Sequence, residues 1–128
     1  MTYEKLKLAL MAGCDVSFTF EPHLSLLTQK EAKKLVVTGR RCIESYMIYQ
    51  SDDDIECIAF STHHLTVAND VRPVLEISKY VIRNTDTPEV KLTSYFLSPH
   101  EYSFLRDPLT FEGQVGTSFK FIVSNRAP

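Results

Sequence analysis

Two adjacent histidines, His63 and His64, have side chains that could bind zinc or exchange protons near neutral pH. They lie in a run of alternating apolar and polar residues, which predicts a strand, and neighbouring residues of a strand point to opposite faces. The two imidazoles could therefore not bind one ion from regular β structure. No His-x-x-x-His pair or thiolate cluster lies nearby, so we expect no metal and interpret His64 as a hydrogen-bonded structural residue.

Three other patterns resemble chemical sites but lack essential parts. The acidic run Asp52-Asp53-Asp54 is not followed by the glycine and glutamate that a calcium loop places at its sixth and twelfth positions, so it predicts a solvated turn. Serine, histidine and aspartate occur, but the Gly-x-Ser-x-Gly elbow of a hydrolase does not. Gly113-Gln114-Val115-Gly116 is too short for a phosphate-binding loop. We therefore expect no catalytic residue, no cofactor and no enzymatic activity.

Aromatic residues are plentiful, with 6 tyrosines and 8 phenylalanines among 128 residues and no tryptophan. Two interpretations are open: the rings pack in the core and across strands, or they line a cavity inside a curled sheet. Under the second interpretation, a ligand would contact Tyr46, Tyr80 and Tyr95 together with His64.

Size and charge restrict the classes of function. At this length, with 44% hydrophobic residues, one domain spanning residues 1–128 is expected. The 14 basic and 16 acidic residues leave a net charge of −2, so a broad positive surface for nucleic acid is not expected. The apolar runs are far shorter than the roughly 20 residues that cross a bilayer. We therefore expect neither nucleic-acid binding nor a membrane span.

The three cysteines, Cys14, Cys42 and Cys57, allow one internal disulfide at most and leave an odd thiol, which is typical of a reducing compartment. No signal-peptide core follows Met1. Such a sequence fits a cytoplasmic protein or a mature domain without its export signal, so the location stays unassigned. We predict that no disulfide is required.

The pattern of apolar residues predicts one helix at the start of the chain. Residues 3–12 have helical spacing, Thr2 can cap the helix, Gly13 can end it, and Leu6 and Leu10 should be buried. Residues 16–20 then alternate as a half-buried strand. Residues 23–39 show no clear pattern, and we interpret them as a variable connection.

The rest of the chain predicts strands. Residues 41–49 and 55–68 form a hairpin, and pairing Gln50 with Asp54 would place Met47 opposite Cys57. Residues 74–83 and 90–97 form a second hairpin, followed by extended segments at 110–115 and 118–123 and a frayed tail. One face of the first hairpin is uncharged and is the predicted core side: Ile43, Ser45, Met47, Tyr49, Ile55, Cys57 and Ala59.

These elements predict an α+β, mostly β fold. An N-terminal helix precedes six or seven strands in an antiparallel meander, which is either open or curled into a barrel or half-barrel. Curling would hide the sheet edges and would explain why several strands are apolar on both faces.

Four short strings, spread over most of the chain, carry a resemblance to a known family. They are Tyr3-Glu4-x-Leu6-x-x-Ala9-Leu10-x-x-Gly13 with Val16, Ile58-Ala59-Phe60-Ser61-x-x-His64-x-Thr66-Val67, Pro73-Val74, and Leu97-Ser98-Pro99-x-x-Tyr102 ahead of Phe111. In this order they resemble the VirK-like family, small proteins best known from bacteria that infect plants, with related domains in some invertebrates. The resemblance implies a secreted, virulence-associated protein and brings no catalytic residues.

The chain departs from the family pattern at two positions. Cysteines that the resemblance implies near Ser25 and Gly113 are both absent, as expected after the loss of a disulfide. This departure weakens the implied oxidising location. Two functions are carried forward: a noncatalytic module that binds a protein partner, as a secreted or delivered bacterial factor would, or a binder of a small hydrophobic ligand in a lipocalin-like barrel. The oligomeric state is not predicted.

Overall fold

The computed structural model describes residues 2–21, 41–67 and 72–124. The connection predicted at 23–39 and the tail at 125–128 lie outside these residues. The described elements are one helix and eight strands: α1 (Tyr3–Met11), β1 (Asp15–Phe20), β2 (Arg41–Cys42), β3 (Tyr46–Gln50), β4 (Glu56–Val67), β5 (Pro73–Arg83), β6 (Glu89–Leu97), β7 (Leu109–Gln114) and β8 (Phe119–Ser124).

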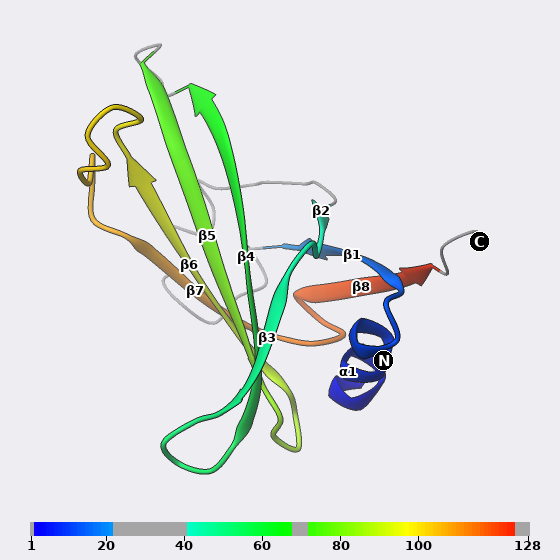
Figure 1. The fold of residues 1–128 in the computed structure, drawn as a ribbon. Coiled ribbons are helices and arrows are strands. Elements are labelled where there is room, and N and C mark those ends of the chain that lie inside the picture. Colours follow the sequence, from blue (N-terminus) through cyan, green and yellow to red (C-terminus); the bar gives the residue numbers. More distant parts are fainter. Residues whose placement is uncertain (1, 22–40, 68–71, 125–128) are drawn as a thin grey trace.

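Five strands form an antiparallel meander in the order β3-β4-β5-β6-β7. The second predicted hairpin is confirmed, because β5 and β6 pair from Arg83 opposite Glu89 to Leu75 opposite Leu97. β4 and β5 pair over eleven positions, and both extend well beyond β3 (Figure 1). The far end of this sheet therefore projects away from the rest of the molecule.

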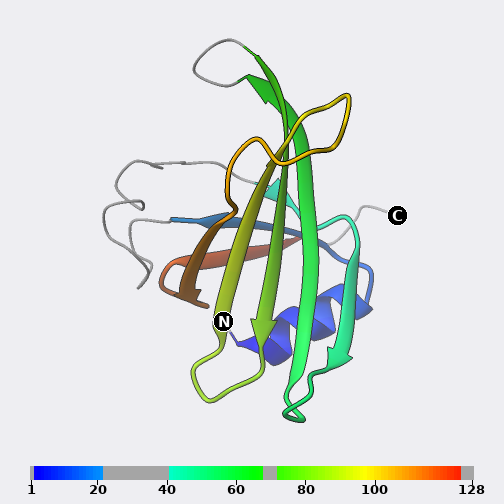
Figure 2. The same ribbon diagram turned by 90° about the vertical axis from the view of Figure 1, so that its left-hand side faces the viewer.

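The other three strands form a second antiparallel sheet in the order β2-β1-β8. The first and last described strands thus pair side by side, and they cross the long strands of the larger sheet (Figure 2). The helix lies on the same side of the larger sheet as β1 and β8 (Figure 1). The predicted mostly β fold with an N-terminal helix is confirmed, with eight strands in place of six or seven.

The barrel variant of the prediction is wrong for the part of the chain that the structure describes. After the turn at Gly116, which has a φ of +95°, β8 leaves the meander and pairs with β1. The larger sheet consequently has β3 and β7 as its two edges instead of closing one onto the other.

The helix forms as its sequence predicts. The Thr2 side chain accepts a hydrogen bond from the backbone N–H of Lys5, and Gly13 follows with a φ of +77°, a conformation that favours glycine. Leu6 and Leu10 are buried, whereas Leu8 on the opposite side is 60% exposed. The helix therefore covers the core with the face that its apolar spacing indicates.

The prediction for the first hairpin is wrong in two respects. Residues 41–49 form two strands, because Arg41 and Cys42 pair with β1 in the other sheet. The β3–β4 register places Met47 opposite Ala59 rather than Cys57. The loop is longer than predicted, since Asp54 has a φ of +61° and Ser51 bonds Ile55 through both its backbone and its side chain.

The predicted core side of this hairpin is also wrong, except at Cys57, which is buried. The face that meets α1 and the smaller sheet contains Ile58 and Phe60, which are buried, while Met47 on the other face is 59% exposed. This face contains the charged residue Glu56, whereas the predicted core side is the face without a charge. The Glu56 carboxylate is paired with Lys7 at 3.0 Å and accepts a hydrogen bond from Tyr3, so helix residues compensate its charge.

The core between the two sheets is aromatic. The Phe18 ring lies 5.2 Å from Phe60, 4.9 Å from Tyr80 and 5.1 Å from Phe119, measured between ring centroids. Phe60 and Tyr80 stack at 4.9 Å. All three cysteines are free, and Cys42 lies opposite Ser17 in β1 rather than in the first hairpin.

Candidate functional site

The four residues of the predicted ligand set do not converge. Tyr46, Tyr80 and His64 occupy the inner face of the larger sheet, as the register with Phe60 and Glu76 shows, but Tyr95 lies opposite Ile77 on the outer face. Tyr80 is buried in the aromatic core, while Tyr46 is 40% exposed at the edge strand. A single cavity lined by all four is therefore not formed.

Tyr80 is a core residue with a polar end. Burial raises the pKa of its phenol to about 12, and the positive charge of Arg41 opposes this shift. The nearby Thr62 hydroxyl also lowers this pKa. It lies outside hydrogen-bonding geometry, and Thr62 Oγ1 is buried without a hydrogen-bond partner in the described part of the chain. Tyr80 therefore stays protonated and has no accessible role as a base.

His64 connects the two sheets. Arg41 of β2 lies 3.1 Å from His64 Nδ1, and a guanidinium can only donate, so Nδ1 is the acceptor. Nε2 then carries the proton and donates to Glu76 of β5 at 3.2 Å. Both imidazole nitrogens are thus occupied within the protein, which supports the prediction that His64 is a structural hydrogen-bonding residue. His63, by contrast, is exposed on the opposite face.

A short polar row continues from this pair along the inner face. Ser78 contacts Glu76 at 3.5 Å and Ser94 at 3.2 Å, and both serines are buried. Glu76 thus lies between the histidine and the serine. A nucleophilic serine needs the histidine as its direct partner, so this order does not match a hydrolase triad.

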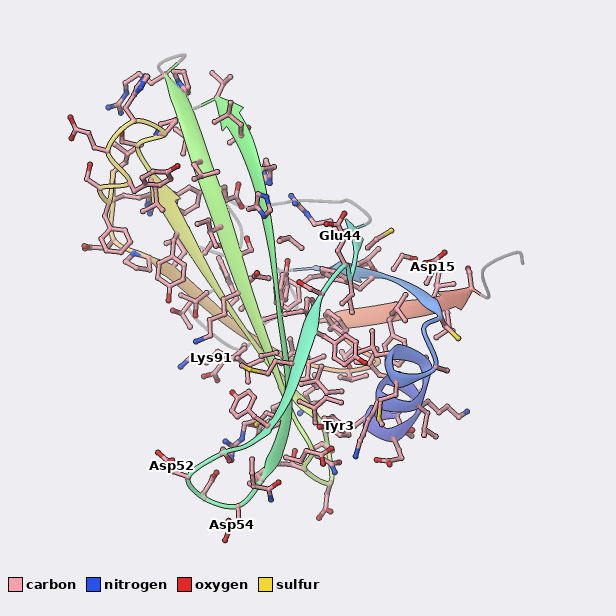
Figure 3. All side chains as sticks on the ribbon, in the orientation of Figure 1. Tyr3, Asp15, Glu44, Asp52, Asp54 and Lys91 are labelled. Carbon is pink, nitrogen blue, oxygen red and sulfur yellow. The ribbon has the colours of Figure 1, made fainter. Side chains whose placement is uncertain are left out.

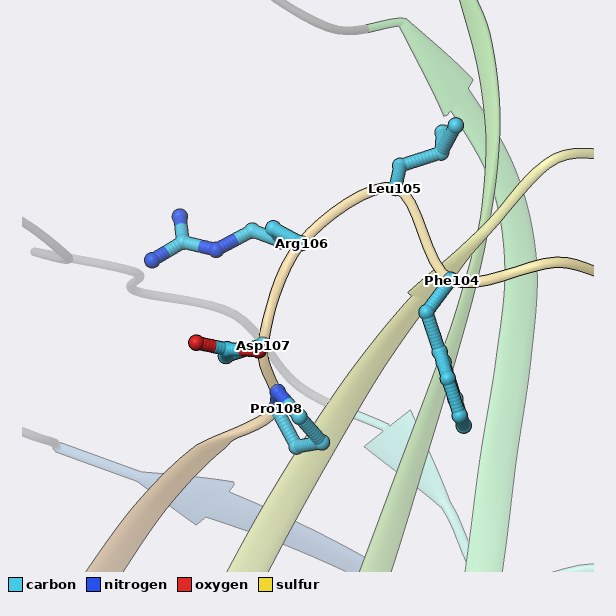
Figure 4. Close-up of a pocket in the computed structure, with 5 residues that line it drawn as sticks. All are labelled: Phe104, Leu105, Arg106, Asp107 and Pro108. Carbon is cyan, nitrogen blue, oxygen red and sulfur yellow. The ribbon is translucent and has the colours of Figure 1, made fainter.

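Two pockets lie on the surface beside these elements. One, of about 620 Å³, lies between the end of α1 and the chain segment that leads from β2 to β3, and Asp15, Glu44 and Tyr46 are among the residues that line it. Figure 3 labels Asp15 and Glu44. Another, of about 610 Å³, is formed by five consecutive loop residues after β6, whose side chains point in different directions (Figure 4). The lining of the first pocket includes carboxylates and thiols but no histidine, lysine or arginine, and that of the second includes one acidic and one basic side chain but no nucleophile, and we assign no chemistry to them.

The outer face of the projecting sheet end carries an apolar surface. Leu65, Leu75 and Leu97 lie side by side across three strands, and Ile77 and Tyr95 form the next row. The Phe104 ring stacks on Tyr95 at 6.1 Å. We call the exposed and half-buried members of this set the distal apolar surface: Leu65, Val67, Leu75, Ile77, Tyr95 and Phe104.

This surface is exposed to a degree that is unusual for apolar side chains. Leu65 is 66% and Phe104 65% exposed, and the inner side of the same strands carries the polar row around His64. Contiguous exposed apolar side chains are typical of interaction sites. Sequence reasoning missed this surface because each residue fits an ordinary strand pattern. The available signal was that β4, β5 and β6 have apolar residues on both faces.

Neither a metal-binding cluster nor a membrane-spanning helix occurs within the described ranges 2–21, 41–67 and 72–124. No group of three or more His, Cys, Asp or Glu side chains there could hold a metal ion. No helix in those ranges is both long and apolar enough to cross a membrane.

Comparison with known proteins gives a consistent result. The family model described as "VirK protein" matches residues 1–102. The fold is similar to the crystal structure of a VirK family protein from Legionella pneumophila, with a TM-score of 0.76 and 15% sequence identity over 94% of this chain and 95% of that one. No curated protein matches the sequence.

Proposed function

Since the chain belongs to the VirK protein family, with four-fifths of its length matched, we propose that it is a noncatalytic module that binds a protein partner through the distal apolar surface. The single observation that carries this proposal is the group of six apolar side chains on the outer face of the projecting sheet end. Leaving them in water costs free energy that a partner would recover, at roughly 25 cal/mol per Å² of apolar area buried.

The location of this surface favours recognition of a large partner. It lies on the projecting end of the sheet (Figure 1), and of its six residues only Phe104 lines one of the pockets described above, so a small molecule could bury little of itself there. Aromatic side chains are also the residues that most often dominate protein interfaces, and Tyr95 and Phe104 are stacked together in this surface, at its β6 side.

The alternative function, a small hydrophobic ligand between the sheets, has less support. The inner face of the sheet is occupied by the rings of Phe18, Phe60, Tyr80 and Phe119, which pack at centroid distances between 4.9 and 6.3 Å. A lipocalin-like site needs a lined void at this position. The filled interior therefore favours surface recognition over ligand storage.

Site-specific photo-crosslinking in the producing cells and in any host tests the proposal. A photoreactive residue in place of Phe104 or Ile77 should crosslink a specific protein, while the same residue in place of Ile122, which is 51% exposed on β8, should not. Equal crosslinking from all three positions would contradict it. If the chain is an exported virulence-associated factor, as the family resemblance implies, the captured protein belongs to the host.

A further inference from the structure

A row of three side chains joins the two sheets beyond the aromatic core. β2 contributes Arg41, β4 contributes His64 and β5 contributes Glu76. The Arg41 guanidinium lies 3.1 Å from Nδ1 of the imidazole, and the Glu76 carboxylate lies 3.2 Å from Nε2. The side chains of His64 and Glu76 are 34% and 23% exposed, so protons from solvent reach the imidazole. The two ring nitrogens therefore face opposite charges.

The hydrogen bonds of this row require a neutral imidazole. A guanidinium can only donate, so Nδ1 of His64 must accept from Arg41 while Nε2 carries the proton and donates to Glu76. A second proton would have to bind Nδ1, where it would point at the guanidinium. Imidazoles gain such a proton between about pH 8 and pH 5. Two donors and two positive charges would then meet, so protonation removes the contact with Arg41 and strengthens the contact with Glu76.

The other titratable and charged groups on the described elements around His64 leave this outcome unchanged. Its neighbours on the inner face of β4 are two threonines, which carry no charge. On β5, Tyr80 keeps its proton throughout this range, because burial raises its pKa to about 12. Arg106, after β6, lies over the Phe96 ring, which is opposite Glu76 in the register, and it also keeps its charge. Among these groups, Glu76 supplies the negative charge that stabilises the protonated imidazole.

β2 is a strand that the loss of one contact can loosen. It has two residues, it lies at the edge of its sheet, and it pairs with β1 at two positions. Next to it, the Ile43 N–H donates to the Val16 carbonyl at 2.8 Å. Short edge segments with few contacts open more easily than the strands of a core. The backbone of β2 should therefore respond when Arg41 is released.

The released guanidinium has space and a second carboxylate nearby. A pocket of about 460 Å³ lies between β4 and the chain segment that leads from β2 to β3. Arg41 and Glu44 both line it, together with Ser61 and His63 of β4. A guanidinium that leaves His64 can thus remain hydrated in this pocket beside a negative charge, which lowers the free-energy cost of the change.

We propose that His64 is a pH-dependent switch between the two sheets. In its neutral form it ties β2 to the larger sheet through Arg41, and in its protonated form it holds Glu76 alone and releases β2. The gain at Glu76 and the loss at Arg41 oppose each other, so the change is confined to β2 and the pocket beside it. The switch does not rest on the proposed function, because His64 lies on the inner face, opposite the distal apolar surface.

Nuclear magnetic resonance of the wild-type full chain tests the switch. At about pH 7.5 the imidazole of His64 should carry its proton on Nε2. Between about pH 7.5 and pH 5, the protection of the Ile43 amide from hydrogen exchange should fall roughly tenfold or more, since a hydrogen bond to a charged group is lost. The Ile82 amide of the central strand β5 should keep its protection. A proton on Nδ1 at neutral pH, or unchanged protection of Ile43, would overturn the proposal.

Two variants distinguish a switch from a merely structural contact. Glu76→Gln removes the stabilising carboxylate and should move the midpoint of the His64 titration to lower pH, by roughly 0.5 pH unit or more. Arg41→Gln removes the opposing charge and should move it to higher pH. The control is His63→Ala, at an exposed position of the same strand, which should move it in neither direction. Shifts in the same direction, or none, would contradict the switch. The wild-type measurement holds whether or not a variant folds.

Discussion

At the residue scale, Glu56 shows why the core face of a strand can be misjudged from sequence. A charged residue argues against burial, and the sequence therefore predicts the opposite, uncharged face of the first hairpin as its core side. In the fold, Lys7 and Tyr3 from the helix reach the carboxylate, and these contacts hold the Glu56 pKa below its usual value. The sequence positions are about 50 residues apart, so only the folded chain brings the compensating groups together.

His64 gives the first prediction at this scale. His64→Ala should lower the free energy of unfolding by about 1 to 3 kcal/mol, because Arg41 and Glu76 lose their common partner. The matched control is His63→Ala, at an exposed position of the same strand, which should change stability by less than about 0.5 kcal/mol. Urea denaturation of both variants measures the difference. If the His64→Ala and His63→Ala variants were equally stable, the structural role of His64 would be contradicted.

Asp53 gives a prediction for pH. Arg83 at 2.6 Å, assisted by Ser51, lowers the Asp53 pKa to about 2. A carboxyl whose pKa is lower in the folded than in the unfolded state stabilises the fold above its unfolded pKa of about 4, and this contribution is lost as the pH falls towards 2. Asp53→Asn and Arg83→Gln should each flatten the stability curve between pH 4 and 2. The double variant should add nothing further, and additive losses would disprove the pairing.

At the scale of elements, the sequence predicts correctly those helices and strands whose formation depends on residues close together in the chain. Thr2, Gly13 and the spacing of Leu6 and Leu10 were enough to predict the helix, and the second hairpin was predicted with its boundaries. The split of residues 41–49 into β2 and β3 could not be predicted, because pairing of Arg41 and Cys42 with β1 depends on a contact between distant segments. The distal apolar surface was missed for the same reason, since the pairing of three strands creates it.

The helix gives the prediction at this scale. Leu6→Ala should destabilise the protein by about 2 to 5 kcal/mol, since Leu6 is fully buried and its truncation leaves a cavity. Leu8→Ala removes the same atoms from a side chain that is 60% exposed, so it should cost less than about 0.5 kcal/mol. Thermal or urea unfolding of the two variants compares them directly. Similar small losses would mean that the helix contributes little to the core.

At the scale of the whole molecule, the two sheets have different roles. The β2-β1-β8 sheet and the helix cover the near part of the larger sheet and enclose the aromatic core. The far part of β4, β5 and β6 projects beyond them, with an apolar outer face (Figure 1). The family relationship and the strands were predictable from sequence, whereas this division into a covered and an uncovered half was not, because it follows from where β8 pairs.

One binding titration tests the central claim most directly. The protein captured by crosslinking is purified and titrated against the wild-type chain, the Phe104→Ser/Ile77→Ser variant and the Ile122→Ser control, all shown to be folded by circular dichroism. Loss of these apolar contacts should weaken binding by roughly 30-fold or more, which corresponds to about 2 kcal/mol. The control should bind as the wild type does. Unchanged affinity of the Phe104→Ser/Ile77→Ser variant would contradict recognition through the distal apolar surface.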